Sequence, residues 1–181
     1  LPLFQKIEAD KRNMQAIILV PTHELAIQVR NQIKVLVESS KIDISSAIII
    51  GNVNIKRQIE TLKKDKPHII VGSPGRILEL INLKKIKAHT IKTIVVDEVD
   101  RLLDNKNINE IQSIIKATLK ERQLMFISAT IPDTTLSIAE GLMKGYKLIR
   151  IKEKKALSQG INHMYFTCGP KDKILVLRKL M

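Results

Sequence analysis

The chain has 181 residues, enough for one well-buried domain with some sequence to spare. Hydrophobic residues make up 44% and charged residues 27%, a balance that is typical of a folded domain and excludes a disordered chain. The 31 Lys and Arg residues outnumber the 18 Asp and Glu residues, and the net charge of +13 favours an anionic partner such as nucleic acid over a general lysine bias on exposed helices.

The cysteine count and the apolar stretches limit the cellular setting. Cys168 is the single cysteine, which excludes an internal disulfide and a cysteine-based zinc cluster. We therefore expect a reducing compartment, the cytoplasm. No apolar stretch has transmembrane length and no signal peptide opens the chain, so we expect no membrane association. The start at Leu1-Pro2, without methionine, predicts the interior of a longer protein.

Short apolar runs alternate with segments of helical periodicity along the chain. Six runs predict strands: residues 16–20, 47–50, 68–71, 93–97, 124–128 and 147–151. Five amphipathic segments predict helices: residues 24–38, 55–64, 74–81, 108–119 and 134–143. This alternation predicts an α/β fold, a parallel sheet with right-handed crossovers and helices on both faces.

The composition changes after residue 151. Residues 152–160 are polar and without periodicity, as linkers are. Residues 150–181 carry eight Lys or Arg and two Asp or Glu, a net charge of +6. Residues 161–168 predict a strand and residues 171–180 a helix, too little for a separate core. The expected organisation is a first domain over 1–151, a linker over 152–160 and the beginning of a second domain over 161–181.

The run 93–97 ends in Asp97, and Glu98 and Asp100 follow it, which places three carboxylates within four positions. The β-branched run predicts a strand covered on both faces, as in a parallel sheet. Open α/β sheets bind ligands at the carboxyl ends of their strands, and Mg²⁺ needs only one or two protein carboxylates. Asp97 and Asp100 also suit capping of the next helix. This stretch alone supports both interpretations equally.

Four other predicted strands also end in polar motifs, so the five motifs belong on one rim of the sheet. The four are Pro21-Thr22-His23-Glu24-Leu25-Ala26, Gly51-Asn52, Ser73-Pro74-Gly75-Arg76 and Ser128-Ala129-Thr130. Helix capping explains each of them taken alone. As a set they favour a phosphate-binding rim, because helix starts at Thr22 and Ser73 expose backbone N–H groups and Arg76 offers a fork matched to phosphate.

The order and spacing of these motifs resemble the first RecA-like domain of the DEAD-box RNA helicases. The matches are residues 21–26 to PTRELA, 51–52 to GG, 73–76 to TPGR, 97–100 to DEAD and 128–130 to SAT. The resemblance runs from about residue 1 to residue 180, its last part to the start of the family's second domain. It implies a RecA-like, P-loop NTPase-type sheet in an enzyme that uses ATP and Mg²⁺ and binds RNA.

The resemblance implies a role for each matched residue. Asp97 would hold Mg²⁺ through water and Glu98 would orient or deprotonate the attacking water, since phosphoryl transfer depends on positioning and electrostatics. Asp100 would tie this motif to the hydroxyls of Ser128 and Thr130 and so to domain closure. The implied RNA-binding residues are Thr22, His23, Gly51, Asn52, Ser73, Gly75 and Arg76. With 3% aromatic residues and no tryptophan, we expect sequence-independent backbone contacts rather than base stacking.

Three residues need separate comment. His23 stands where the family usually has arginine, which predicts pH-dependent RNA contact; an exposed helix-start residue without a special role is the alternative. Asn52 replaces the second glycine of its motif and restricts close backbone approach. His68, at a predicted strand start, is expected to be structural.

The chain contains no G-x-x-x-x-G-K-[ST] phosphate loop. In the family this loop lies just before a segment like residues 1–7, and the arginine-bearing motifs lie in the second domain. We therefore expect the chain alone to lack ATPase activity, and its sheet to lack the P-loop strand and leave an unpaired strand edge. A non-enzymatic nucleic-acid-binding scaffold with a degenerate ATPase domain, or a related DNA helicase, are the other interpretations.

Overall fold

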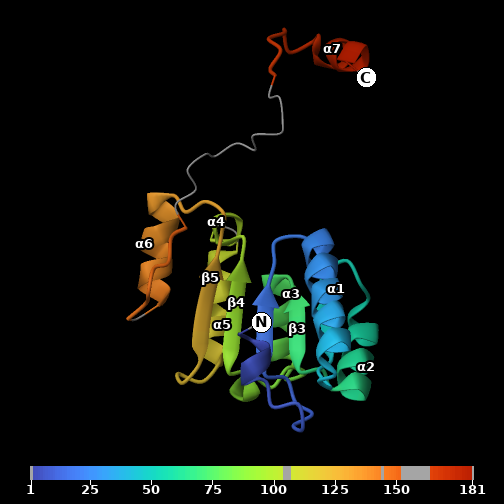
Figure 1. Ribbon diagram of the computed structural model, residues 1–181, viewed down its shortest axis with the longest axis vertical. Coiled ribbons are helices and arrows are strands. Elements are labelled where there is room, and N and C mark those ends of the chain that lie inside the picture. The colour runs from blue at the N-terminus through green and yellow to red at the C-terminus, as the bar shows by residue number, and fades with distance from the viewer. Residues whose placement is uncertain (1, 104–106, 144, 152–163, 181) are drawn as a thin grey trace. The chain divides into compact units, whose positions relative to one another are not determined.

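The computed structural model describes residues 2–103, 107–143, 145–151 and 164–180. The chain divides into two compact units, Leu1–Tyr146 and Lys147–Met181. The first unit is a parallel sheet flanked by helices (Figure 1), and it holds all five motifs. No helix among the described residues is long and apolar enough to cross a membrane.

Five parallel strands form one sheet in the order β2-β3-β1-β4-β5. They are β1 (Ala16–Leu19), β2 (Ser46–Ile49), β3 (Ile69–Gly72), β4 (Thr93–Asp97) and β5 (Gln123–Ile127). The ladder aligns Leu19 with Gly72 and with Val96, so the central strands end at the same level. Strands β1 and β3 are buried along their whole length, as continuous β-branched runs predict. The α/β fold with a parallel sheet is confirmed.

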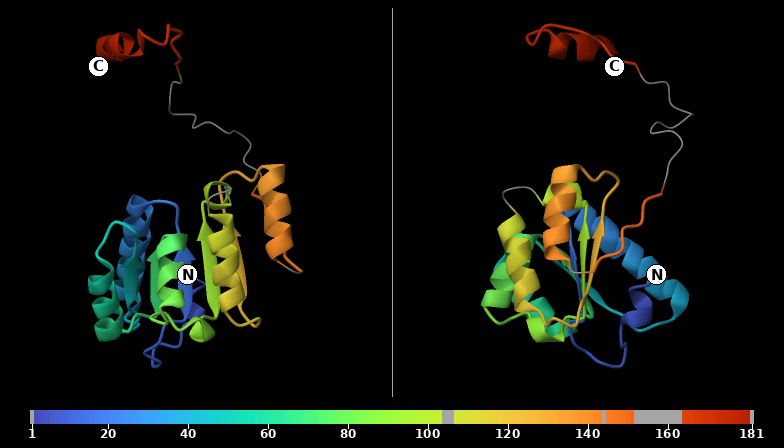
Figure 2. Two further views of the ribbon diagram at one scale, coloured as in Figure 1. Left: turned by 180° about the vertical axis from the view of Figure 1, so that it is seen from behind. Right: turned by 90° about the vertical axis from the view of Figure 1, so that its left-hand side faces the viewer.

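Helices cover both faces of this sheet (Figure 2). The predicted helices are confirmed as α1 (His23–Ser40), α2 (Ile55–Asp65), α3 (Pro74–Asn82), α5 (Ile108–Ala117) and α6 (Asp133–Leu142). A short α4 (Val99–Leu102) follows β4, and two 3-10 helices, η1 (Phe4–Lys6) and η2 (Ala88–Thr90), complete the unit.

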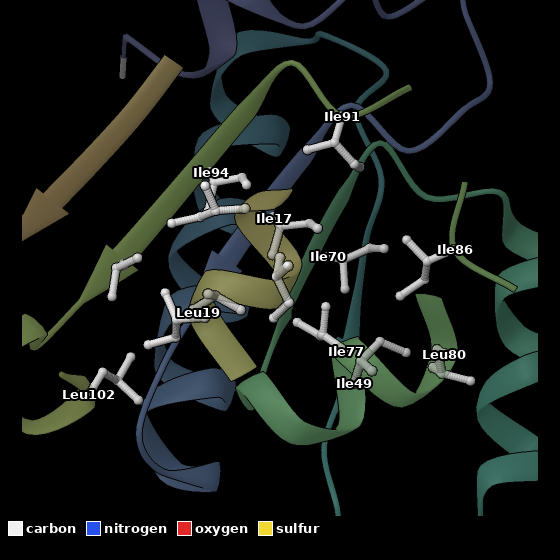
Figure 3. Close-up of a cluster of buried hydrophobic side chains, with 14 of the residues drawn as sticks. Ile17, Leu19, Ile49, Ile70, Ile77, Leu80, Ile86, Ile91, Ile94 and Leu102 are labelled. Atoms are coloured by element: carbon white, nitrogen blue, oxygen red, sulfur yellow. The ribbon is translucent and has the colours of Figure 1, made fainter. Parts of the chain in front are cut away.

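Alternate residues of each strand enter different cores, because successive strand side chains point to opposite faces. Ile17 and Leu19 of β1 join the larger cluster with α3 and α5, shown in Figure 3. Ile18 joins the smaller cluster with Ala26 and Ile33 of α1. The two cores hold the sheet between its helix layers and so fix the level of the strand ends.

Gly72, the last residue of β3, has a neighbour that leaves no room for a side chain. A Cβ at this position would lie 1.8 Å from the carbonyl oxygen of Ile49 on β2. Directly after it, the Ser73 N–H donates to the same Ile49 carbonyl oxygen at 3.1 Å. This close approach of β2 and β3 sets where the motif after β3 begins.

Two predicted strands are wrong. Residues 147–151 form no strand, and the side chains of Ile149 and Ile151 are 75% and 88% exposed. A strand needs a neighbour that takes its backbone hydrogen bonds, which an apolar run alone does not supply. The described part of 161–168, residues 164–168, forms no strand either, while the predicted linker 152–160 lies outside the described residues. The predicted terminal helix is confirmed as α7 (Lys173–Leu180).

Strand β5 is an open edge of the sheet. It pairs with β4 and with no other strand in the part of the chain that is described. Its residues are half-buried or exposed, and Ile127 is 51% exposed, whereas β4 is buried over its first four residues. Strand β2 is the other edge of the described sheet, so an edge left unpaired by a missing P-loop strand stays a prediction.

Candidate functional site

The five motifs lie at the carboxyl ends of the five parallel strands, the upper ends in Figure 1. The motif at 21–26 leads from β1 into α1, and the motif at 73–76 leads from β3 into α3. The acidic motif at 97–100 and the hydroxyl motif at 128–130 follow the neighbouring strands β4 and β5. Parallel pairing therefore places side chains from distant parts of the sequence on one rim.

Asp97 is the last residue of β4 and is half-buried. Its Oδ1 accepts a hydrogen bond of 3.0 Å from the Glu98 N–H. Burial raises the pKa of Asp97 above its ordinary value, and the hydrogen bond from the Glu98 N–H only partly offsets this rise. No cationic side chain forms an ion pair with Asp97 in the described part of the chain. A bound cation would offset the burial of this carboxylate.

The donor set at Asp97 suits Mg²⁺. Among the described residues there is no group of three or more His, Cys, Asp or Glu side chains placed to cage a metal ion. Mg²⁺ keeps several waters and takes one or two carboxylates together with substrate phosphates. One half-buried aspartate at a strand end, with Glu98 next to it, is sufficient for that mode of binding.

Glu98 makes the sharp turn from β4 into α4. Its backbone is left-handed, with φ 49° and ψ 54°, which costs a non-glycine residue about 1 kcal/mol. Its Oε2 accepts a hydrogen bond of 3.1 Å from Arg101 Nη1, within an exposed ion pair. Because exposed ion pairs contribute little, the Glu98 carboxylate is readily available for another partner.

Asp100 joins the acidic motif to the hydroxyl motif. Its Oδ2 accepts a hydrogen bond from the Thr130 hydroxyl, and its Oδ1 accepts one of 3.1 Å from the Arg101 N–H. Thr130 and then nearby Ser128 lower the pKa of Asp100 below its ordinary value. Ser128 Oγ is nevertheless buried without a partner of hydrogen-bonding geometry. The structure thus brings together the residues that the resemblance links.

Arg76 is used inside the protein rather than presented to solvent, since its side chain is 13% exposed. Its Nη2 donates to the Gly51 carbonyl oxygen at 2.7 Å, and its Nη1 donates to the Val53 carbonyl oxygen at 2.8 Å. Its Nε forms an ion pair of 2.9 Å with Glu79. The guanidinium fork therefore holds the loop that carries the Gly51-Asn52 motif.

Gln58 of α2 is a second support of this loop, and the motif comparison missed it. Its Nε2 donates to the Ile50 carbonyl oxygen at 2.8 Å, and its Oε1 accepts from Arg76 at 3.3 Å. Gln58 is 4% exposed. The sequence could have indicated the role of Gln58, because it lies three residues after Ile55 and therefore on the apolar face of a predicted helix.

The residues around this loop divide into exposed and packed ones. Thr22 caps α1 as predicted, because its Oγ1 accepts a hydrogen bond of 3.2 Å from the Leu25 N–H. His23, Gly51 and Asn52 are exposed. Their polar groups and the start of α1 are therefore open to a ligand on this rim.

The motif after β3 is more constrained. Ser73 occupies the N-cap position of α3, with Pro74 at the start of the helix, but the Ser73 hydroxyl makes no capping hydrogen bond. A Cβ on Gly75 would lie 3.0 Å from Glu110 Oε1 of α5, the end of a flexible side chain that can move aside, so packing alone does not require this glycine.

His68 is structural, as predicted. The imidazole is fully buried, its Nδ1 accepts a hydrogen bond of 3.1 Å from the Ser45 N–H, and its Nε2 lies 3.2 Å from the Ala9 carbonyl oxygen. Burial lowers the pKa of His68 below its ordinary value. The neutral ring therefore joins the segment before β1 to the start of β3.

A parallel sheet with an acidic motif and a hydroxyl motif at neighbouring strand ends is the arrangement of a RecA-like domain. Within that class, the family model of the DEAD/DEAH box helicases matches residues 1–138, and the chain belongs to this family.

Relatives and solved structures agree with this assignment. The chain is similar to the probable ATP-dependent RNA helicase YfmL of Bacillus subtilis, with 39% identity over 99% of this chain and 47% of YfmL. It is 40% identical to the DEAD-box ATP-dependent RNA helicase CshC of Bacillus cereus, over 100% of this chain and 46% of CshC. The chain thus spans about half the length of these curated relatives.

Two solved structures show the same fold. A DEAD box protein from the hyperthermophile Methanococcus jannaschii matches with a TM-score of 0.70 and 33% identity, over 81% of this chain and 39% of that one. Dbp5 of S. cerevisiae, bound to RNA and ADP BeF3, matches with a TM-score of 0.70 and 27% identity, over 83% and 37% of the two chains.

Proposed function

We propose that this chain is part of an ATP-dependent RNA helicase that couples ATP hydrolysis to RNA binding and local duplex unwinding. The observation that carries this function is the hydrogen bond between Asp100 and Thr130, which joins an acidic motif to a hydroxyl motif at one rim of the sheet. The names of YfmL and CshC as ATP-dependent RNA helicases support the same function.

Asp97 and Glu98 supply the chemistry at the nucleotide. Asp97 would hold Mg²⁺ through its water shell, and Mg²⁺ neutralises the charge that develops on the transferred phosphoryl group. Glu98 would leave its exposed pair with Arg101, accept a hydrogen bond from the attacking water and orient it.

Asp100 acts as a positioning residue. Because Thr130 donates to Asp100, a displacement of the acidic motif is passed to the hydroxyl motif and to α6, which begins three residues later at Asp133. This connection would link the state of the nucleotide to the closing of the two domains. We propose residues 1–151 as an N-terminally truncated first domain, residues 152–160 as the linker and residues 161–181 as the beginning of the second domain.

RNA would bind along the rim through its backbone and independently of base sequence. The exposed groups there are those of Thr22, His23, Gly51 and Asn52, with backbone N–H groups at the starts of α1 and α3. Arg76 holds the Gly51 loop in place. The net charge of +13 favours binding to a polyanion, and the single cysteine suits a cytoplasmic protein.

A non-enzymatic nucleic-acid-binding scaffold with a degenerate ATPase domain is the second candidate, because the net charge of +13 favours binding to a polyanion whether or not ATP is hydrolysed. The deciding experiment measures RNA-stimulated ATP hydrolysis and RNA affinity of the protein as its gene encodes it, with Glu98→Gln alongside. For a helicase, Glu98→Gln abolishes hydrolysis and leaves RNA affinity within about twofold. RNA binding by the unmodified protein without any ATP hydrolysis would establish the scaffold.

A further inference from the structure

A cavity of about 350 Å³ opens at the amino-terminal end of the strands, away from the five motifs. Its walls come from four places: the segment before β1, the second half of α2, the turn after α3, and η2. None of the residues assigned above to nucleotide or RNA lines it. It is therefore a separate feature of the first unit.

Five cationic side chains line this basic cavity and no carboxylate does: Arg12, Lys63, Lys66, Lys85 and Lys87. Arg12 is paired with Asp43. The four lysines form no ion pair with any residue of the described ranges. A concave surface with one sign of charge attracts and orients an anionic partner.

The backbone that carries these lysines is held in place. Lys66 ends α2 with a left-handed φ of 42°, and its N–H donates to the Leu62 carbonyl oxygen at 3.3 Å. Thr90 Oγ1 lies 2.6 Å from the Met14 carbonyl oxygen and 2.8 Å from that of Lys87, so it ties two walls together. Such a preformed wall lowers the entropy cost of binding.

The lining also contains an apolar floor and one unsatisfied acceptor. Met14, Ile59 and Leu62 form the floor, which offers no hydrogen bond from its side chains and so suits an apolar group. Asn13 Oδ1 is buried and has no hydrogen-bond partner. This atom is closed to solvent, so the apolar floor and the lysines are the features that a ligand meets in the cavity.

We infer that the basic cavity docks an acidic peptide segment of a partner protein. The carboxylates of the segment pair with the four lysines, and one apolar side chain lies on the floor. An RNA phosphate backbone matches the lysines but places no apolar side chain on the floor. The tail of this chain, residues 150–181, has eight basic and two acidic residues. Its net charge of +6 makes it unsuitable as the segment that binds in the basic cavity.

The test measures binding of a fluorescent peptide of glutamates around one leucine to the full chain, by anisotropy. The double variant Lys85→Glu/Lys87→Glu is expected to weaken binding about tenfold or more, because two attractions become repulsions. The matched control, Lys34→Glu/Lys116→Glu, changes the net charge equally at exposed positions elsewhere and is expected to stay within about twofold. Replacing the peptide's leucine by serine is expected to weaken binding to the unmodified chain.

Several results would overturn the inference. Equal weakening by the two double variants would mean that the peptide responds to net charge alone. No binding of the peptide to the unmodified chain, with RNA binding reduced only by Lys85→Glu/Lys87→Glu, would make the cavity a nucleic-acid site. Thermal unfolding of both double variants shows that they are folded, so a loss of peptide binding reports on the cavity itself.

Discussion

Replacing Arg76 separates two roles that its motif allows, contact with phosphate and support of the neighbouring loop. In Arg76→Ala the carbonyl oxygens of Gly51 and Val53 lose hydrogen bonds of 2.7 and 2.8 Å from a charged donor. Such bonds contribute about 1.5–3 kcal/mol each when buried. Both carbonyl oxygens belong to exposed residues and regain water, so we expect the free energy of unfolding to fall by a total of about 2–3 kcal/mol.

Two further variants sharpen this prediction. Arg76→Lys keeps the charge but cannot reach both carbonyl oxygens and Glu79 at once, so it is expected to lose about 1–2 kcal/mol. Arg57→Ala removes the same charge from an exposed position on α2 and is expected to change stability by less than about 0.5 kcal/mol. Urea unfolding followed by circular dichroism measures all three.

RNA binding over a range of salt concentrations completes the experiment. If Arg76 only supports the loop, Arg76→Ala lowers RNA affinity without changing the slope of log affinity against log salt concentration. If Arg76 contacts a phosphate, Arg76→Ala reduces the magnitude of that slope by about 0.7 for single-stranded RNA. Unchanged stability of Arg76→Ala together with a reduced slope would refute the supporting role.

Three other perturbations have defined outcomes. Burial lowers the pKa of His68 from 6.5, so the stability that the neutral ring contributes is complete above pH 6.5 and is lost as the pH falls through the lowered pKa. In urea unfolding, His68→Gln should remove this pH dependence, and the control His89→Gln should leave it unchanged. Gly72→Ala should cost about 3 kcal/mol or more against the Ile49 carbonyl oxygen, whereas Gly51→Ala, with nothing within 4 Å, should leave stability unchanged in the same assay. RNA affinity should fall between pH 6 and 8 for the natural chain and not for His23→Arg; identical pH profiles would remove the special role of His23.

The sequence by itself determined the sheet and its working rim. Continuous β-branched runs predict strands buried on both faces, and β1, β3 and β4 have that burial. Parallel strands then necessarily bring the ends after Leu19, Gly72 and Asp97 to one side. The pattern of apolar residues within each segment is enough to predict the strands and their burial, because apolar residues occupy the positions that face the core.

The tertiary structure alone decided which polar atoms meet. The Arg76 guanidinium can donate equally well to a phosphate or to the carbonyl oxygens of Gly51 and Val53. In the folded protein it donates to the two carbonyl oxygens. The apolar run 147–151 had strand character, yet no neighbouring strand pairs with it among the described residues. Hydrogen-bond partners and strand pairing depend on groups distant in sequence, whose approach is set by packing of the two cores and not by local pattern.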